Sequence, residues 1–333
     1  MSKITDQLVN SNLCRNTVSW LSRHRLGRPL ILFYHGVSVE AVSAQKALLG
    51  RFGDKHLPLD SFVTHLKTLK KSWRVIGLNE MVAGLRAGDE MRGTIAITFD
   101  DGYENNVLKA APVLADFNMP ASFFIATDFI GTNKWIWTDH VEVLIRRTKA
   151  KKVFFAPRNI SFSLASEDSK NIAINEIKAA VKGLGNAERL AWIQVLGEEL
   201  GDDLNDAPVG DQRFMSWDQV RSLSQSGFEV GGHTMSHPIL SRLPFDEAKN
   251  EILGCCERIK RELGKCSPIF CYPNGKSSDY TKEIMEFCAE HFDSAVSTNR
   301  GPARADELFE LRRLGTPTGA RLSNIDWLLF TSR

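Results

Sequence analysis

Short apolar runs alternate along the chain with longer segments in which apolar residues recur every three to four positions. Short apolar runs are typical of buried strands, and the longer period is typical of amphipathic helices. Strands are predicted at residues 30–33, 73–76, 94–99, 121–126, 228–230, 268–271 and 294–297. Helices are predicted between them at residues 59–69, 105–117, 244–263 and 278–289. This repeated order predicts an α/β fold with a mostly parallel sheet or barrel.

Residues 131–213 show a different pattern, with helix-like segments and no clear strand. We interpret them as an inserted helical cap within one domain of residues 30–333, which follows an N-terminal helical segment of residues 1–29. A cap beside a pocket would influence substrate choice, and a cap that only covers a barrel flank fits the pattern equally. Near its start lie Trp135, Trp137 and Asp139, which could line a pocket, although tryptophans in an amphipathic helix are more often core residues. 

The segment Ser216-Trp217-Asp218-Gln219 fits a capping box. The serine side chain can accept from the third helical amide while the glutamine reaches back to the serine N–H. This pattern predicts a helix that starts there and ends at Gly227.

Composition narrows the class of protein. The chain has 333 residues, 43% apolar and 25% charged, which is typical of a globular protein with a large core. Its net charge of +2 is too small to indicate nucleic-acid binding. The basic stretch at residues 146–152 could contact a phosphate or lipid head groups, but a solvated helix end explains it equally well.

The sequence also indicates the cellular compartment of the protein. Residues 1–28 lack the continuous apolar core of a signal peptide, and no stretch approaches the roughly 20 apolar residues of a membrane span. The six cysteines have no spacing that suggests disulfides or a cysteine-based metal site. We therefore expect a cytoplasmic protein with reduced thiols, in which the early helical segment could rest on a membrane surface.

Four polar clusters each follow a predicted strand. In parallel α/β proteins the carboxyl ends of the strands share one edge, so clusters distant in sequence meet around one pocket. They are Tyr34-His35, Asp100-Asp101-Gly102, His233-Thr234-Met235-Ser236-His237 and Tyr272-Pro273-Asn274-Gly275. This arrangement is typical of an active site.

Two of these clusters together indicate a metal. Adjacent carboxylates such as Asp100 and Asp101 repel each other when buried, so a cation or a shared proton has to relieve them. Alternatively, one of them caps the following helix. His233 and His237 are four residues apart, a separation that places two imidazoles on one side of a helical turn within reach of one ion. The alternative is a pair of core or capping histidines.

The segment Thr98-Phe99-Asp100-Asp101-Gly102, followed by the two histidines, resembles the first two motifs of the polysaccharide deacetylase family, carbohydrate esterase family four. The resemblance covers roughly residues 30–316. It implies a distorted (β/α) barrel that removes acyl groups from amino sugars, usually at a Zn²⁺ centre. By motif position, Asp101, His233 and His237 resemble the metal ligands and Asp100 the catalytic base. Three protein ligands would leave a position open for water, as a catalytic zinc site requires.

The third family motif is matched only in part, by Tyr272, Pro273, Asn274 and Gly275. We expect this loop to contact the substrate, with the backbone N–H of Asn274 as an oxyanion donor. Many members carry an arginine before the loop that pairs with the base, and this chain has Cys271 there. Arg312 or Arg313 could supply the missing charge, although a surface salt bridge is an alternative use for either.

The family's usual general acid is a histidine in a late Leu-x-His motif, which is missing after Gly275. His291 lies there, but at a predicted helix end. We expect His35 to take the acid role, because it follows the first strand and imidazole suits proton transfer near neutral pH. A packed histidine at a strand end is the alternative.

The predicted function is that of a metal-dependent hydrolase that removes an N-acetyl group from an amino sugar. In a cytoplasmic protein, the substrate would be an intermediate of surface polysaccharide or glycolipid biosynthesis, with a nucleotide-linked or a lipid-linked sugar as the candidates. Removal of a formyl group or of an ester-linked acetyl group uses the same chemistry. A non-catalytic saccharide-binding member of the family is the alternative from another class, but a purely structural metal site needs no base such as Asp100.

Overall fold

The computed structural model describes residues 28–38, 55–201 and 207–316. The strands are β1 (Leu30–Tyr34), β2 (Gly36–Ser38), β3 (His56–Pro58), β4 (Arg74–Val75), β5 (Thr94–Phe99), β6 (Ser122–Ile125), β7 (Lys152–Phe155), β8 (Ile160–Ser163), β9 (Glu229–Gly232), β10 (Ile269–Cys271), β11 (Ser294–Val296) and β12 (Leu314–Gly315). The α-helices are α4 (Leu59–Ser72), α5 (Leu78–Ala87), α6 (Ala111–Phe117), α7 (Trp137–Arg147), α8 (Glu167–Lys182), α9 (Asn186–Leu200), α10 (Trp217–Gln225), α11 (Phe245–Leu263) and α12 (Lys282–His291). Shorter helical segments are the π-helix η2 (Asn106–Ala110) and the 3₁₀ helices η3 (Ala156–Arg158), η4 (Gly210–Gln212), η5 (Leu240–Arg242) and η6 (Ala305–Glu310).

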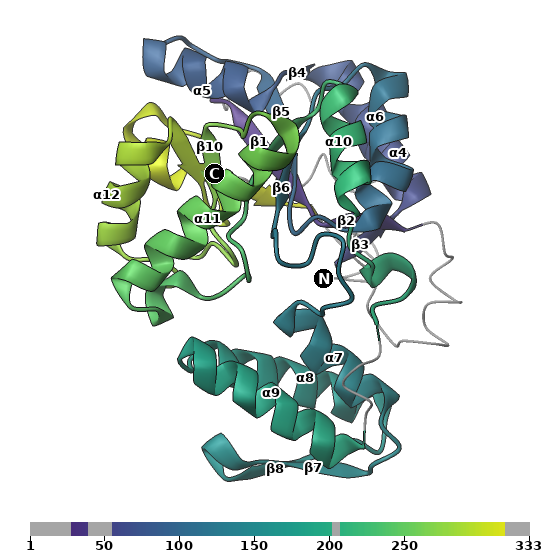
Figure 1. The fold of residues 1–333 in the computed structure, drawn as a ribbon. Coiled ribbons are helices and arrows are strands. Elements are labelled where there is room, and N and C mark those ends of the chain that lie inside the picture. The colour runs from purple at the N-terminus through teal and green to yellow at the C-terminus, as the bar shows by residue number, and fades with distance from the viewer. Residues whose placement is uncertain (1–27, 39–54, 202–206, 317–333) are drawn as a thin grey trace, which may run out of the picture.

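A parallel sheet forms the centre of the molecule. Its order is β12-β1-β5-β6-β9, and β4 pairs with the start of β5. Tyr34 pairs with Phe99 and Phe99 with Phe123, so β1, β5 and β6 present their carboxyl ends at one edge. A second parallel pair, β10–β11, continues the curve, and helices surround the strands (Figure 1). The predicted parallel α/β fold is confirmed, although the described strands form separate sheets rather than one closed hydrogen-bonded ring.

The strand β5 carries the first polar cluster and is buried along its whole length. Its last residue, Phe99, stacks on Tyr34 of β1 and on Phe123 of β6, with ring centroids 5.2 and 4.9 Å apart. Full burial of a large apolar side chain contributes about 1.5–3 kcal/mol. The aromatic layer therefore holds three strand ends in fixed positions directly beneath the polar edge.

The predicted capping box is also present. Ser216 accepts from the backbone N–H of Gln219, and the Gln219 side chain accepts from the backbone N–H of Ser216. The helix α10 starts there as predicted and ends at Gln225, two residues before Gly227.

The middle of the chain forms a separate body below the sheet, made of α7, α8, α9 and the antiparallel hairpin β7–β8 (Figure 1). It has its own apolar cluster, which includes Trp137, Phe155 and Ile177. The hairpin corrects our expectation of a purely helical insertion. Phe154 is exposed between the buried Val153 and Phe155, so the run is apolar throughout and lacks the alternation that marks a half-buried strand.

Within the described residues, none of the helices has the length and apolar character needed to cross a membrane. Residues 1–27, most of the predicted N-terminal helical segment, lie outside the described part of the chain.

Candidate active site

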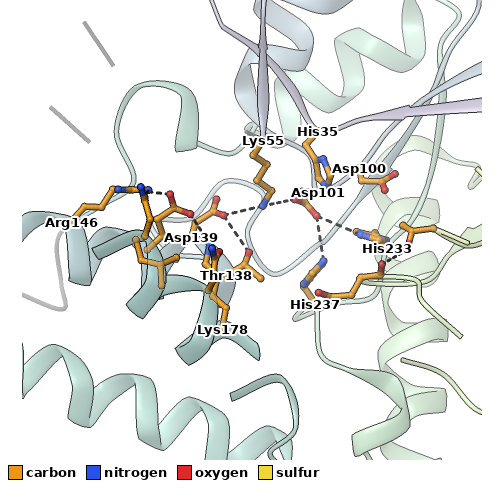
Figure 2. A pocket seen from close by; sticks show the side chains of 16 residues that line it. His35, Lys55, Asp100, Asp101, Thr138, Asp139, Arg146, Lys178, His233 and His237 are labelled. Carbon is orange, nitrogen blue, oxygen red and sulfur yellow. Dashed lines mark hydrogen bonds and ion pairs between the residues drawn. The ribbon is translucent and has the colours of Figure 1, made fainter. Parts of the chain in front are cut away.

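A cavity of about 440 Å³ lies where the carboxyl ends of the central strands face the insertion (Figure 2). Six residues of the four polar clusters line it, and every cluster contributes at least one. They are His35, Asp100, Asp101, His233, His237 and Asn274. The polar clusters at the strand ends therefore meet around one cavity, as predicted.

Asp101 faces both histidines. Its Oδ1 lies 3.5 Å from Nε2 of His233 and 3.3 Å from Nε2 of His237, and all three side chains are buried. The Nδ1 atom of His233 lies 2.8 Å from the carbonyl oxygen of Cys271, to which it can donate. That bond would leave Nε2 of His233 with a free lone pair directed at Asp101.

The two histidines do not lie on a helical turn, contrary to the geometry that we expected from their spacing. Residues 233–237 form a loop in which Thr234 and His237 have left-handed backbones, with φ of 67° and 53°. Glu251 on α11 accepts from the backbone N–H groups of Met235 and Ser236, both at 2.8 Å. The loop is thus fixed by a half-buried glutamate rather than by helical hydrogen bonds, and it still brings both Nε2 atoms to one carboxylate.

The donor set fits a divalent metal. One ligand atom from each of Asp101, His233 and His237 lies within 4.8 Å of the others. Burial lowers the pKa of His237 to about 4, which keeps its imidazole neutral and available for coordination. Burial disfavours the charged form of Asp101, but Lys55 and the two histidines hold its pKa well below the usual range. Burial lowers the pKa of His233, but Cys271 and the carboxylates of Asp101 and Asp100 outweigh this effect and raise it, so a metal would have to displace a proton from this imidazole. One carboxylate and two deprotonated imidazoles are ligands that zinc prefers.

Asp100 is paired with Arg313. Two parallel hydrogen bonds of 2.8 and 2.7 Å join the guanidinium to the carboxylate, and Arg313 also donates to the carbonyl oxygen of Ser297. Burial raises the pKa of Asp100, but the charge of Arg313 outweighs this effect and lowers it. Of the two arginines considered from the sequence, Arg312 instead pairs with Glu307 at 2.8 Å, with 41% of its side chain exposed.

Arg313→Met is expected to lower the free energy of unfolding by about 3–5 kcal/mol, because it leaves the buried carboxylate of Asp100 without its partner. Arg312→Met is the matched control. Its ion pair is largely solvated, and we expect a change of less than about 1 kcal/mol. Urea denaturation of both variants measures the difference. Equal effects would show that the Asp100 pair contributes no more than a surface salt bridge.

Lys55 was not identified from the sequence. Its Nζ lies 2.8 Å from Oδ2 of Asp101 and 3.0 Å from Asp139 of α7, and it also donates to the hydroxyl of Tyr103. Burial lowers the pKa of Lys55, and the two carboxylates raise it above its ordinary value. Lys55 belongs to no motif in the sequence, so only the three-dimensional contact reveals it. Asp139, which we considered as a lining residue, does line the cavity.

The two tryptophans at the start of the insertion do not line this cavity in the described structure. Trp137 is buried in the apolar cluster of the insertion, and Trp135 stacks on His140. Both positions agree with the interpretation as packing residues.

The remaining predicted residues divide into lining and supporting positions. His35 follows β1, is half-buried and lines the cavity, and burial lowers the pKa of its imidazole. Asn274 lines it with a left-handed backbone, φ 58°. Tyr272 is buried away from the cavity and donates to the carbonyl oxygen of Phe309. Gly275 donates to Pro273 and has φ of 70°, so these two residues shape the turn that presents Asn274.

Comparison with known proteins places the chain in a family. The family model described as polysaccharide deacetylase matches residues 87–289, more than half of the chain. The chain therefore belongs to the polysaccharide deacetylase family, as predicted from its motifs. A search among curated proteins gave no significant match.

Two solved structures are similar in fold. One is the Streptococcus pyogenes deacetylase PplD in complex with acetate, at 16% identity and a TM-score of 0.58, over 92% of this chain and 97% of that one. The other is IcaB from Ammonifex degensii, at 16% identity and a TM-score of 0.56, over 91% of this chain and 97% of that one. Both similarities extend over nearly the whole chain, so the insertion and the sheet together belong to the shared fold.

Proposed function

We propose that this protein is a metal-dependent hydrolase that removes an N-acetyl group from an amino sugar. The observation that carries the proposal is the convergence of one carboxylate and two imidazoles within 4.8 Å, beside a second carboxylate held by an arginine, at the floor of a polar cavity. Family membership agrees with this chemistry.

The ligands in this proposal are Asp101, His233 and His237. A Zn²⁺ ion held by them would act as a Lewis acid that activates water and polarises the acyl carbonyl. The side chains of this chain then do the proton transfers. Asp100, fixed in its ionised form by Arg313, takes the proton from the attacking water. The backbone N–H of Asn274 is our candidate donor to the oxyanion that forms.

His35 is our candidate for the group that protonates the leaving amine. Among the residues that line the described cavity, it is the one histidine not assigned to the metal. The family's late histidine has no counterpart, because His291 ends α12 and its ring nitrogen lies 2.9 Å from the carbonyl oxygen of Phe287.

His35→Gln is expected to lower kcat by about 100-fold and to leave zinc content unchanged, because glutamine keeps a polar side chain but cannot transfer a proton. His65→Gln is a suitable comparison, since His65 is buried beside the hydroxyl of Tyr34 and does not line the cavity. Steady-state acetate release and metal analysis test the pair. An unchanged kcat in His35→Gln would remove this residue from the proposal.

Acetate release from a panel of acetamido sugars by the zinc-loaded protein tests the function itself. Matched formamido sugars and O-acetyl sugars belong in the same panel, because the proposed attack suits all three carbonyl groups. The N-acetyl substrate is expected to give the highest kcat/KM. Faster release of formate or of ester-linked acetate would move the assignment to a deformylase or an esterase. The cytoplasmic location and a nucleotide or lipid link on the substrate stay predictions from the sequence.

A further inference from the structure

Lys55 connects the proposed metal site to the insertion. Its Nζ lies 2.8 Å from Oδ2 of Asp101 and 3.0 Å from Oδ1 of Asp139, which belongs to the insertion (Figure 2). It also donates to the hydroxyl of Tyr103. An ammonium group has three hydrogens, and these three acceptors use all of them. Lys55 is therefore held in one place and has no hydrogen left to donate to a substrate.

The partners of Lys55 are themselves fixed. Asp139 and Tyr103 are buried, and the Tyr103 hydroxyl donates to Oδ2 of Asp139 at 2.6 Å. Asp139 lies in the first turn of α7, where the helix N-terminus stabilises a negative charge. At the start of the same helix, Trp137 is buried in the apolar cluster of the insertion. The core of the insertion thus determines where Asp139 lies, and with it Lys55.

The contact with Lys55 divides the two oxygens of Asp101 between different partners. Oδ2 lies against Lys55, whereas Oδ1 faces Nε2 of His233 and Nε2 of His237 at 3.5 and 3.3 Å. A carboxylate can bind a metal through one oxygen or through both. Because Oδ2 is occupied, Asp101 has one oxygen to offer beside the two imidazoles. These are three ligand atoms, the number that a catalytic zinc site takes from the protein.

The charge of Lys55 by itself would oppose the binding of a metal ion close by. Asp139 offsets it, because its carboxylate contacts the ammonium group and is only 2% exposed, so that solvent screens the pair weakly. One ammonium and two carboxylates leave the charge of Asp101 uncancelled. Lys55 can therefore orient Asp101 and still leave a negative charge for a metal.

We infer that Lys55, held and neutralised by Asp139 of the insertion, restricts Asp101 to binding a metal through Oδ1 and thereby favours zinc over ions that take more ligands. The inference rests on the metal site of the proposed function and gives the insertion a part in it. Lys55 is a positioning residue in this inference, because it acts through Asp101. Mn²⁺ prefers octahedral, oxygen-rich sites, so a free second oxygen on Asp101 should benefit Mn²⁺ more than Zn²⁺.

Lys55→Met tests the inference, because methionine keeps most of the length of the side chain and leaves Oδ2 of Asp101 free. The quantity to compare is the ratio of the Kd for Mn²⁺ to the Kd for Zn²⁺, measured by competition with a chromophoric chelator. We expect this ratio to fall by at least about tenfold, which is the smaller of the typical effects of losing an outer-shell partner. The visible spectrum of bound Co²⁺ should change from the intense bands of four-coordinate cobalt to the weaker bands of higher coordination.

Lys178→Met is the matched control. Lys178 lines the same cavity and is 25% exposed, compared with 21% for Lys55, but in the described structure it contacts Glu142 rather than Asp101. The variant removes the same charge without touching a proposed ligand. Its Kd ratio and its Co²⁺ spectrum should therefore be those of the wild type.

Asp139→Asn is a second test, which also decides if circular dichroism shows that Lys55→Met does not fold. It keeps the size of the side chain and removes the charge that offsets Lys55, so the affinity for Zn²⁺ should fall by at least about tenfold. Glu142→Gln removes the same charge from the cavity side of the same helix, and in the described structure Glu142 contacts Arg146 and Lys178 instead. It should have little effect on zinc affinity.

Two results would overturn the inference: a wild-type Kd ratio and Co²⁺ spectrum in folded Lys55→Met, or equal effects within either matched pair of variants. Both measurements are made without a saccharide, so they do not depend on turnover. A wild-type protein that binds zinc but releases no acetate would count against the proposed hydrolysis alone. A wild-type protein that binds neither zinc nor cobalt would refute the inference together with the proposed metal site.

Discussion

Asp100→Asn is expected to lower acetate release by about 10²–10⁴-fold while the protein keeps its zinc. Asparagine has nearly the shape of aspartate but cannot accept the proton of an attacking water. In the described structure Asp100 also lies close to His233 and Cys271, but its carboxylate is held by Arg313. The metal should therefore remain bound to the proposed ligands Asp101, His233 and His237. The loss should appear in kcat, because the interaction with the proton develops only during the reaction.

Single-turnover kinetics with parallel zinc analysis measures both quantities. Asp116→Asn, an exposed change on α6, is the control and should behave as the wild type. Because Arg313 loses its charged partner in Asp100→Asn, circular dichroism has to show that the variant is folded. Full activity in the folded variant would exclude Asp100 as the base. A wild-type protein that binds sugars but releases no acyl group would instead be a saccharide-binding member of the family.

The fold was largely predictable because its strands are short, buried runs separated by amphipathic helices. Every predicted run overlaps a strand, and most of these strands are buried and largely apolar, as is typical of a parallel sheet covered on both faces. The antiparallel hairpin β7–β8 was not predicted, because its first strand lacks the alternation of apolar and polar residues that marks a half-buried strand. Phe154 is 45% exposed, and an outward-facing aromatic residue makes a half-buried strand look like any other apolar stretch.

The site was predictable where a polar cluster directly follows a strand, because the topology then fixes where the cluster lies. The sequence did not predict which of Arg312 and Arg313 pairs with Asp100. Successive side chains of an extended segment point to opposite faces, so the choice depends on the register of the chain entering β12. In the structure Leu311 and Arg313 are buried and Arg312 is half-buried.

The contacts that the insertion and Lys55 make with the cavity could not be predicted from patterns in the sequence. The periodicity of α7 and α8 predicts which face of each helix is apolar, but not which outer residues face a pocket on another part of the chain. Glu142 and Lys178 lie on different helices of the insertion and meet at 2.6 Å only after the fold is complete. Such pairs depend on long-range packing, which leaves no local signal in a single sequence.

His237→Ala is expected to abolish acetate release together with high-affinity zinc binding, because it removes one of three proposed ligands. Loss of an outer-shell partner alone typically costs 10–100-fold in metal affinity, so loss of a ligand should cost more than about 100-fold. Alanine tolerates the left-handed backbone of His237, φ 53°, somewhat less well than histidine, but the N–H of residue 237 still donates to Oγ1 of Thr234 in the variant. The loop should therefore keep its shape, and the change should be specific to the metal.

Thermal unfolding with and without added Zn²⁺ gives a readout that does not depend on activity. A ligand at about 100 times its Kd stabilises the folded state by about 2.7 kcal/mol. The wild-type Tm should therefore rise on addition of zinc, and the Tm of His237→Ala should not. His291→Ala is the matched control, because this exposed histidine ends α12 and does not line the cavity, and it should respond like the wild type. An equal rise in Tm for His237→Ala would mean that zinc binds elsewhere, and the ligand set that underlies the proposed hydrolysis would then be wrong.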